Sequence, residues 1–147
     1  MKIGSQAHHR TAISASNAHT IVVQHNGVTV ATYPASFGSG DDIGDPNRVT
    51  RSGIHVVSDK QQTTTMSNPA YGYSNVTEYW AVRISDNGEF IHQNQNTVAD
   101  QGVVNVSHGC INLSAENAQA YYQSAIYGDP VQVTGSSVPL SAGAFGR

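Results

Sequence analysis

Cys110 and two histidines, His92 and His108, are the residues of this chain whose types and spacing together point to nucleophilic chemistry. Cys110 is the single cysteine, it directly follows His108 and Gly109, and His92 lies eighteen positions upstream at the end of an apolar run. A thiol becomes a strong nucleophile when a nearby base converts it to a thiolate. A lone cysteine with separated histidines is therefore a candidate nucleophile, the alternative being a small buried residue of the core.

Gly109 indicates how an oxyanion site could be built beside this thiol. Glycine adopts backbone conformations that are closed to other residues. A turn built on it can direct consecutive N–H groups at one point, as a developing oxyanion requires. We expect these donors to be the backbone N–H groups of His108, Gly109 and Cys110.

The six-residue stretch from Ser107 to Asn112 reads Ser-His-Gly-Cys-Ile-Asn, and fourteen residues separate His92 from Ser107. This string and spacing resemble the signature of the L,D-transpeptidase catalytic domain, the YkuD-type family, in its mycobacterial form. The resemblance is strongest from residue 80 to residue 133 and thinner from residue 19 to residue 79. It implies a mainly β, sandwich-like fold with the nucleophile at its edge, one main helix after the nucleophile and a long lid loop.

The resemblance also implies a role for each residue of the motif. Cys110 is the nucleophile and His92 the general base, with His108 as a rival base. Gln93 stands where relatives often have Ser or Gly, so its backbone carbonyl would orient the ring of His92. Ser107 would hold the loop by hydrogen bonds. The expected substrate-binding residues are Asn112, Tyr71, Tyr73 and Trp80.

The implied reaction is acyl transfer between peptidoglycan stem tetrapeptides, donor and acceptor, which forms 3→3 cross-links through a thioester. Carbapenem β-lactams would acylate the same cysteine, and no cofactor or metal is expected. Three alternatives remain open: an L,D-carboxypeptidase or cysteine peptidase that uses water, a non-catalytic cell-wall binding module, and a zinc hydrolase. The zinc site would draw on His55, His92, His108 and Cys110, although His55 is also typical of a structural strand residue.

Composition limits the remaining classes of function. The chain has 147 residues, which suits one domain, and its net charge of −3 with no basic patch argues against nucleic-acid binding. No stretch approaches the roughly 18 apolar residues of a membrane span. The family resemblance implies a location outside the cytoplasm, in the periplasm or cell wall, with an export signal or anchor absent from this chain.

The pattern of turn residues divides the chain into elements. We expect an N-terminal extension over residues 1–18, a catalytic domain over 19–134 with a lid at about 59–77, and a C-terminal tail over 135–147. Asn26-Gly27 between two β-rich runs predicts a hairpin. Further strands are expected at 53–58 and 78–85. A helix is expected from Ala115 to about Tyr127, with Ser114 as its N-cap.

Overall fold

The computed structural model describes residues 10–140, apart from the side chain of Tyr71, and contains two β-sheets. The strands are β1 (Arg10–Ala15), β2 (Thr20–His25), β3 (Val28–Pro34), β4 (Gly53–Val56), β5 (Asp59–Asn68), β6 (Tyr73–Arg83), β7 (Phe90–Gln93), β8 (Ile111–Leu113) and β9 (Pro130–Thr134). The helices are α2 (Gly40–Ile43) and α3 (Ala115–Ser124), with short 3-10 turns η1 (Ser16–Ala18), η2 (Pro46–Arg48), η3 (Pro69–Tyr71) and η4 (Gln95–Thr97). The expectation of a mainly β fold with one main helix is confirmed.

β1 is the central strand of the five-stranded sheet, whose order is β3-β2-β1-β9-β4. It pairs antiparallel with β2 and parallel with β9, and Ala12 within it belongs to the buried core. The expected domain start at residue 19 is therefore too late. Burial alternates along this strand: Ala12 and Ser14 are buried, whereas Thr11, Ile13 and Ala15 on the opposite face are half-buried, so the segment shows no continuous apolar pattern. Residues 1–9 of the expected extension lie outside the described part.

The hairpin predicted at Asn26-Gly27 is confirmed as the turn between β2 and β3. Both turn residues have positive φ, 53° for Asn26 and 82° for Gly27, which is what a two-residue hairpin turn requires. Gly27 would meet no atom within 4 Å if it carried a Cβ, so its backbone conformation, and not a lack of space, favours glycine here.

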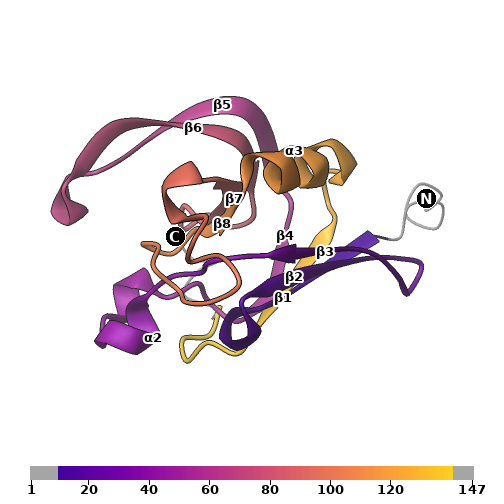
Figure 1. Cartoon of the computed structure of the whole chain (residues 1–147), viewed down its shortest axis with the longest axis horizontal. Coiled ribbons are helices and arrows are strands. Elements are labelled where there is room, and N and C mark those ends of the chain that lie inside the picture. Colours follow the sequence, from indigo (N-terminus) through magenta and orange to yellow (C-terminus); the bar gives the residue numbers. More distant parts are fainter. Residues whose placement is uncertain (1–9, 141–147) are drawn as a thin grey trace.

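The expected lid loop at 59–77 is a long β-hairpin instead. β5 and β6 pair antiparallel over most of their length, and η3 and Gly72 form the turn between them. The segment shows no apolar alternation because both faces of the hairpin are largely solvated, but its β-branched run Thr63-Thr64-Thr65 favours a strand. In Figure 1 the hairpin arches over β7 and β8 and ends well beyond them.

The second sheet has the order β5-β6-β7-β8, and α3 packs against β6 and β7. Buried apolar residues of both sheets and of α3 form one continuous core. The Ser114 side chain caps α3 by accepting a hydrogen bond from the Asn117 N–H at 3.2 Å, as predicted. The helix ends at Ser124, earlier than expected, because Ala125 turns into an extended conformation and the Asp129 carboxylate binds the next backbone N–H.

The first half of the expected C-terminal tail is part of the folded unit. Residues 136–140 run alongside Ser52, which exchanges backbone hydrogen bonds with Val138 and Leu140. Residues 141–147 lie outside the described part. Within residues 10–140 no helix is both long and apolar enough to cross a membrane.

A shortened chain tests the position of β1. A chain that begins at residue 19 lacks the strand that joins β2 to β9, so it should lose cooperative unfolding in urea. A chain that begins at residue 10 should keep it. Circular dichroism during urea titration is the measurement, and cooperative unfolding of the chain that begins at residue 19 would contradict the assigned sheet order.

Candidate active site

The loop that carries Cys110 is held at both ends by one strip of backbone, residues 35–39. The Ser107 N–H donates to the Phe37 carbonyl at 3.0 Å, and the Ser39 N–H donates to the Ser107 carbonyl at 2.9 Å. At the other end, Asn112 and Ser36 exchange two backbone hydrogen bonds of 2.8 and 3.1 Å. Phe37 is fully buried in the core, so the strip is anchored there.

Between these ends the chain makes a tight turn closed by Ser107. Its hydroxyl donates to the Cys110 carbonyl and accepts from the Gly109 N–H at 3.2 Å. Gly109 has φ of 134°, which side-chain-bearing residues rarely adopt. The buried Thr50 hydroxyl then fixes the turn from behind, because it donates to the Gly109 carbonyl at 2.7 Å and accepts from the Gly38 N–H at 2.9 Å.

This turn corrects the expected set of oxyanion donors. The Gly109 N–H is directed at the Ser107 hydroxyl and is not presented to a substrate. Gly109 therefore shapes the loop, and the N–H groups of Cys110, next to the sulfur, and of His108 stay the proposed donors.

His92 lies near the end of β7, where parallel pairing with β8 places it opposite Asn112. The ring is almost fully buried, and its Nδ1 lies 2.6 Å from the Gln93 carbonyl oxygen. This contact orients the ring and leaves Nε2 for the thiol. Cys110 itself is half-buried, with Sγ 3.6 Å from the Gly88 carbonyl oxygen.

The electrostatic surroundings of His92 favour its protonated form. Burial lowers the pKa of His92, but hydrogen bonds to Cys110 and Glu78 and the charges of both groups outweigh that effect and raise the pKa to about 10. The pKa of His108 shifts the other way, below its ordinary value, because of partial burial and the nearby Arg48 guanidinium. Since Cys110 acts on the ring of His92, the structure favours His92 over His108 as its partner.

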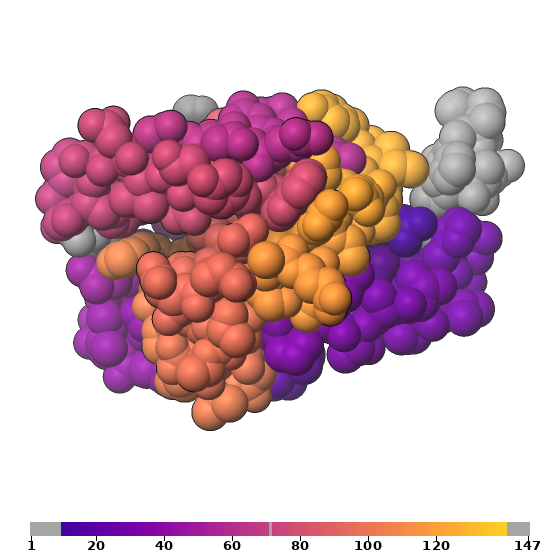
Figure 2. Space-filling model, turned by 45° about the horizontal axis from the view of Figure 1, so that its top comes forward, coloured from indigo at the N-terminus to yellow at the C-terminus, as the bar shows by residue number. Residues whose placement is uncertain are grey.

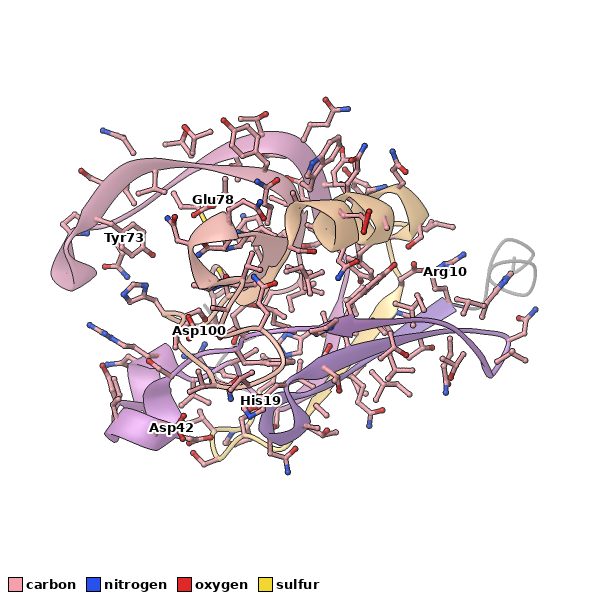
Figure 3. The ribbon with its side chains drawn as sticks, viewed as in Figure 1. Arg10, His19, Asp42, Tyr73, Glu78 and Asp100 are labelled. Carbon is pink, nitrogen blue, oxygen red and sulfur yellow. The ribbon has the colours of Figure 1, made fainter. Side chains whose placement is uncertain are left out.

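Cys110 and His92 open into a cleft of about 440 Å³. One wall is the hairpin, which contributes Met66 of β5 and, from β6, Tyr73 and residues 76–79. The other wall is formed by residues 92–97 together with the nucleophile loop. Figure 2 shows the hairpin lying across a hollow above these loops. The Tyr73 ring reaches down from the hairpin tip to within 5.2 Å of the His108 ring, measured between centroids (Figure 3).

The structure brings most of the expected site residues together. Asn112 is buried at the floor of the cleft, and its Nδ2 donates to the Thr97 hydroxyl at 3.3 Å, which braces η4. Tyr73 and the exposed His108 face each other at the cleft mouth. The side chain of Tyr71 lies outside the described part of the structure.

Trp80 is not among the residues that line the cleft, so the geometry does not support its expected contact with substrate. Its backbone has φ of 54°, an unusual value for a strand residue. The indole ring instead packs edge-on against Tyr122 of α3, with centroids 5.2 Å apart. The expectation rested on the family resemblance alone, which carries no information about this contact with α3.

His55, one of the four residues considered for a zinc site, belongs to a different cluster. Its Nδ1 lies 3.6 Å from a carboxylate oxygen of the buried Glu89, and its Nε2 lies 2.7 Å from the Arg51 carbonyl oxygen. Glu89 also accepts a hydrogen bond from the Ser85 hydroxyl at 2.7 Å. Within residues 10–140, no three His, Cys, Asp or Glu side chains are gathered closely enough to hold a metal ion.

Sequence reasoning missed three contributors to the site: the strip 35–39, the Thr50 hydroxyl and Glu78. The strip and Thr50 act across long sequence separations, and no local pattern signals such pairing. Glu78 gave a weak signal, as an acidic residue within an otherwise β-rich run, which is also typical of a solvated strand face.

Comparisons with known proteins bear directly on this geometry. The L,D-transpeptidase catalytic domain (YkuD) family model matches residues 9–133. The chain belongs to this family. It is 50% identical over 142 residues to "L,D-transpeptidase 5" of Mycobacterium tuberculosis, covering 96% of this chain and 31% of that protein.

Solved structures agree on the fold. The structure of the L,D-transpeptidase LdtMt1 in complex with imipenem superposes with a TM-score of 0.76 at 34% identity, over 85% of this chain and 58% of that one. That of L,D-transpeptidase 3 from Mycobacterium tuberculosis in complex with a faropenem-derived adduct gives 0.74 at 29% identity, over 85% and 60%. The chain spans between about a third and a half of the length of two curated relatives that it matches.

Thr50 gives a test of how the nucleophile loop is held. Thr50→Val keeps the side-chain shape but leaves the buried Gly109 carbonyl and Gly38 N–H unpaired, so the free energy of unfolding should fall by about 2–4 kcal/mol. Thr65→Val, on an exposed position of β5, is the matched control and should change it by less than about 0.5 kcal/mol. Urea denaturation measures both, and equal stability of the two variants would refute the bracing role of Thr50.

Proposed function

We propose that this chain is the catalytic domain of an L,D-transpeptidase that cross-links peptidoglycan stem peptides through a thioester on Cys110. The observation that carries the proposal is the placement of Cys110 against His92 at the base of the hairpin-covered cleft. Family membership supports the reaction class.

The residues suggest the following sequence of steps. With its pKa raised to about 10, His92 already holds the proton released by the Cys110 thiol, and the thiolate attacks the carbonyl carbon of the third residue of a tetrapeptide stem. Negative charge on the carbonyl oxygen is stabilised by the Cys110 N–H. When the carbon–nitrogen bond breaks, the protonated His92 returns its proton to the nitrogen of the terminal D-Ala, which leaves as a free amino acid.

The second half-reaction transfers the acyl group to an amine of another stem. His92 accepts a proton from the attacking amine, the thioester breaks, and the Cys110 thiolate is released with a 3→3 linkage as product. A hairpin that covers the cleft favours an amine over water because it limits access of bulk water to the thioester. Acting on peptidoglycan places the protein outside the cytoplasm, at the cell wall.

β-Lactam acylation of Cys110 tests the first half-reaction. Relatives of this chain have been solved with imipenem and with a faropenem-derived adduct. After incubation with imipenem, intact mass spectrometry should show one adduct on the whole chain. Cys110→Ala should form none, and His92→Gln should form it at least about 100-fold more slowly. Acylation of Cys110→Ala at the normal rate would refute the assignment of the nucleophile.

A pair of tetrapeptide stems tests the second half-reaction. We expect release of D-Ala together with a cross-linked dimer, measured by liquid chromatography and mass spectrometry. Tripeptide without dimer, with Cys110 still required, would instead assign the protein as an L,D-carboxypeptidase. Cys110→Ala is the control for both products.

A further inference from the structure

Glu78 is the single acidic residue among those that line the catalytic cleft. It lies on β6, on the inner side of the arch formed by the hairpin (Figure 3). One of its carboxylate oxygens is 3.4 Å from Nδ1 of His92. The side chains are 18% exposed for Glu78 and 4% for His92, so the contact is largely shielded from water.

We propose that Glu78 is a positioning residue for His92, and that its carboxylate holds the ring in place and supplies the counter-charge when His92 becomes protonated. The inference rests on the proposed function, in which His92 exchanges a proton with Cys110 and with the leaving amine. It concerns a residue that the sequence motif of the family does not include.

The need for a counter-charge follows from the burial of His92. When Cys110 transfers its proton to Nε2, a full positive charge forms on a side chain that is only 4% exposed. A buried charge is costly unless it is paired. The Gln93 carbonyl at 2.6 Å offers a dipole to the Nδ1–H, whereas Glu78 offers an opposite charge to the same N–H. No proton passes to Glu78, because the proton from Cys110 stays on Nε2 until it moves to the leaving amine.

The position of Glu78 along β6 argues against a purely structural role. Its neighbours Thr77 and Tyr79 are exposed, whereas Glu78 is half-buried and directed at His92. If Glu78 only stabilised the hairpin, its carboxylate would be more stable on the solvated face, where the charge stays fully hydrated.

The pKa of His92 agrees with this geometry. Burial lowers this pKa, and the contacts with Cys110 and Glu78 reverse the effect and raise it to about 10. Cys110, from the nucleophile loop, and Glu78, from the hairpin, are the titratable groups that act on His92 among the described residues. Because the pKa is raised, the ring keeps its proton through neutral pH and loses it only as pH rises toward about 10. Removing Glu78 should therefore move that loss to lower pH.

Three variants test the inference through the rate of imipenem acylation, measured by intact mass from pH 6 to pH 10. Glu78→Gln keeps the shape but removes the charge, so acylation should slow about tenfold above pH 8 and its alkaline decline should begin at lower pH. Glu78→Asp restores the charge and should recover part of the rate and of the pH profile. Glu116→Gln removes one charge by the same substitution on the exposed start of α3 and should behave as the unaltered protein.

A second measurement does not depend on activity. In a Cys110→Ala background, the ring of His92 can be titrated by nuclear magnetic resonance, and adding Glu78→Gln should lower its pKa. An unchanged His92 titration, or slowing of acylation by the same factor at every pH, would overturn the inference and leave Glu78 with a structural role. If the unaltered protein forms no adduct, the proposed function fails, while the His92 titration still decides whether Glu78 acts on the ring.

Discussion

Backbone hydrogen bonds between residues 35–39 and the two ends of the nucleophile loop are the constraint on which the catalytic geometry depends. They fix Ser107 and Asn112, the residues on either side of the turn, to a strip anchored in the core by Phe37. A turn centred on Gly109 would otherwise sample many conformations, at a large entropic cost on ordering. Because its ends are already paired, only the short turn remains to be set, and the hydroxyls of Ser107 and Thr50 set it.

Parallel pairing of β7 with β8 fixes the position of the base, just as pairing with residues 35–39 fixes the position of the nucleophile loop. It places His92 beside Asn112, although the two are far apart in sequence, and both strands are buried next to the core. The base therefore sits on a rigid sheet, while the opposite wall of the cleft is a two-stranded hairpin that extends beyond the sheet (Figure 1). A rigid catalytic base beneath an extended wall suits the proposed reaction, in which two large stem peptides must enter and leave.

The motif and its spacing predicted that Cys110, His92 and the Gln93 carbonyl would meet at the site. All three belong to the motif or directly adjoin it, so the motif alone was enough to name them. The turn signals likewise predicted the Asn26-Gly27 hairpin. Sequence reasoning failed where the outcome depends on pairing at a distance. The central place of β1 follows from its parallel partner β9 near the other end of the chain, and the polar hairpin 59–77 has no apolar pattern to indicate strands. The packing of Trp80 against Tyr122 of α3 is likewise a contact between distant segments, which no local side-chain pattern reveals.

The contact between His92 and the Gln93 carbonyl shows how the charge balance of the site is distributed. A backbone carbonyl is available at this position whatever the side chain, so the orientation of the His92 ring does not depend on a hydroxyl there. A carbonyl dipole alone stabilises a buried cation only weakly. The negative charge that the protonated ring of His92 still needs comes from the Glu78 carboxylate on the hairpin. The wall that limits water in the cleft thus also carries the charge that stabilises the protonated base. Both effects are present together only when the hairpin lies over the cleft, so covering the substrate and adjusting the proton affinity of His92 are parts of one structural arrangement.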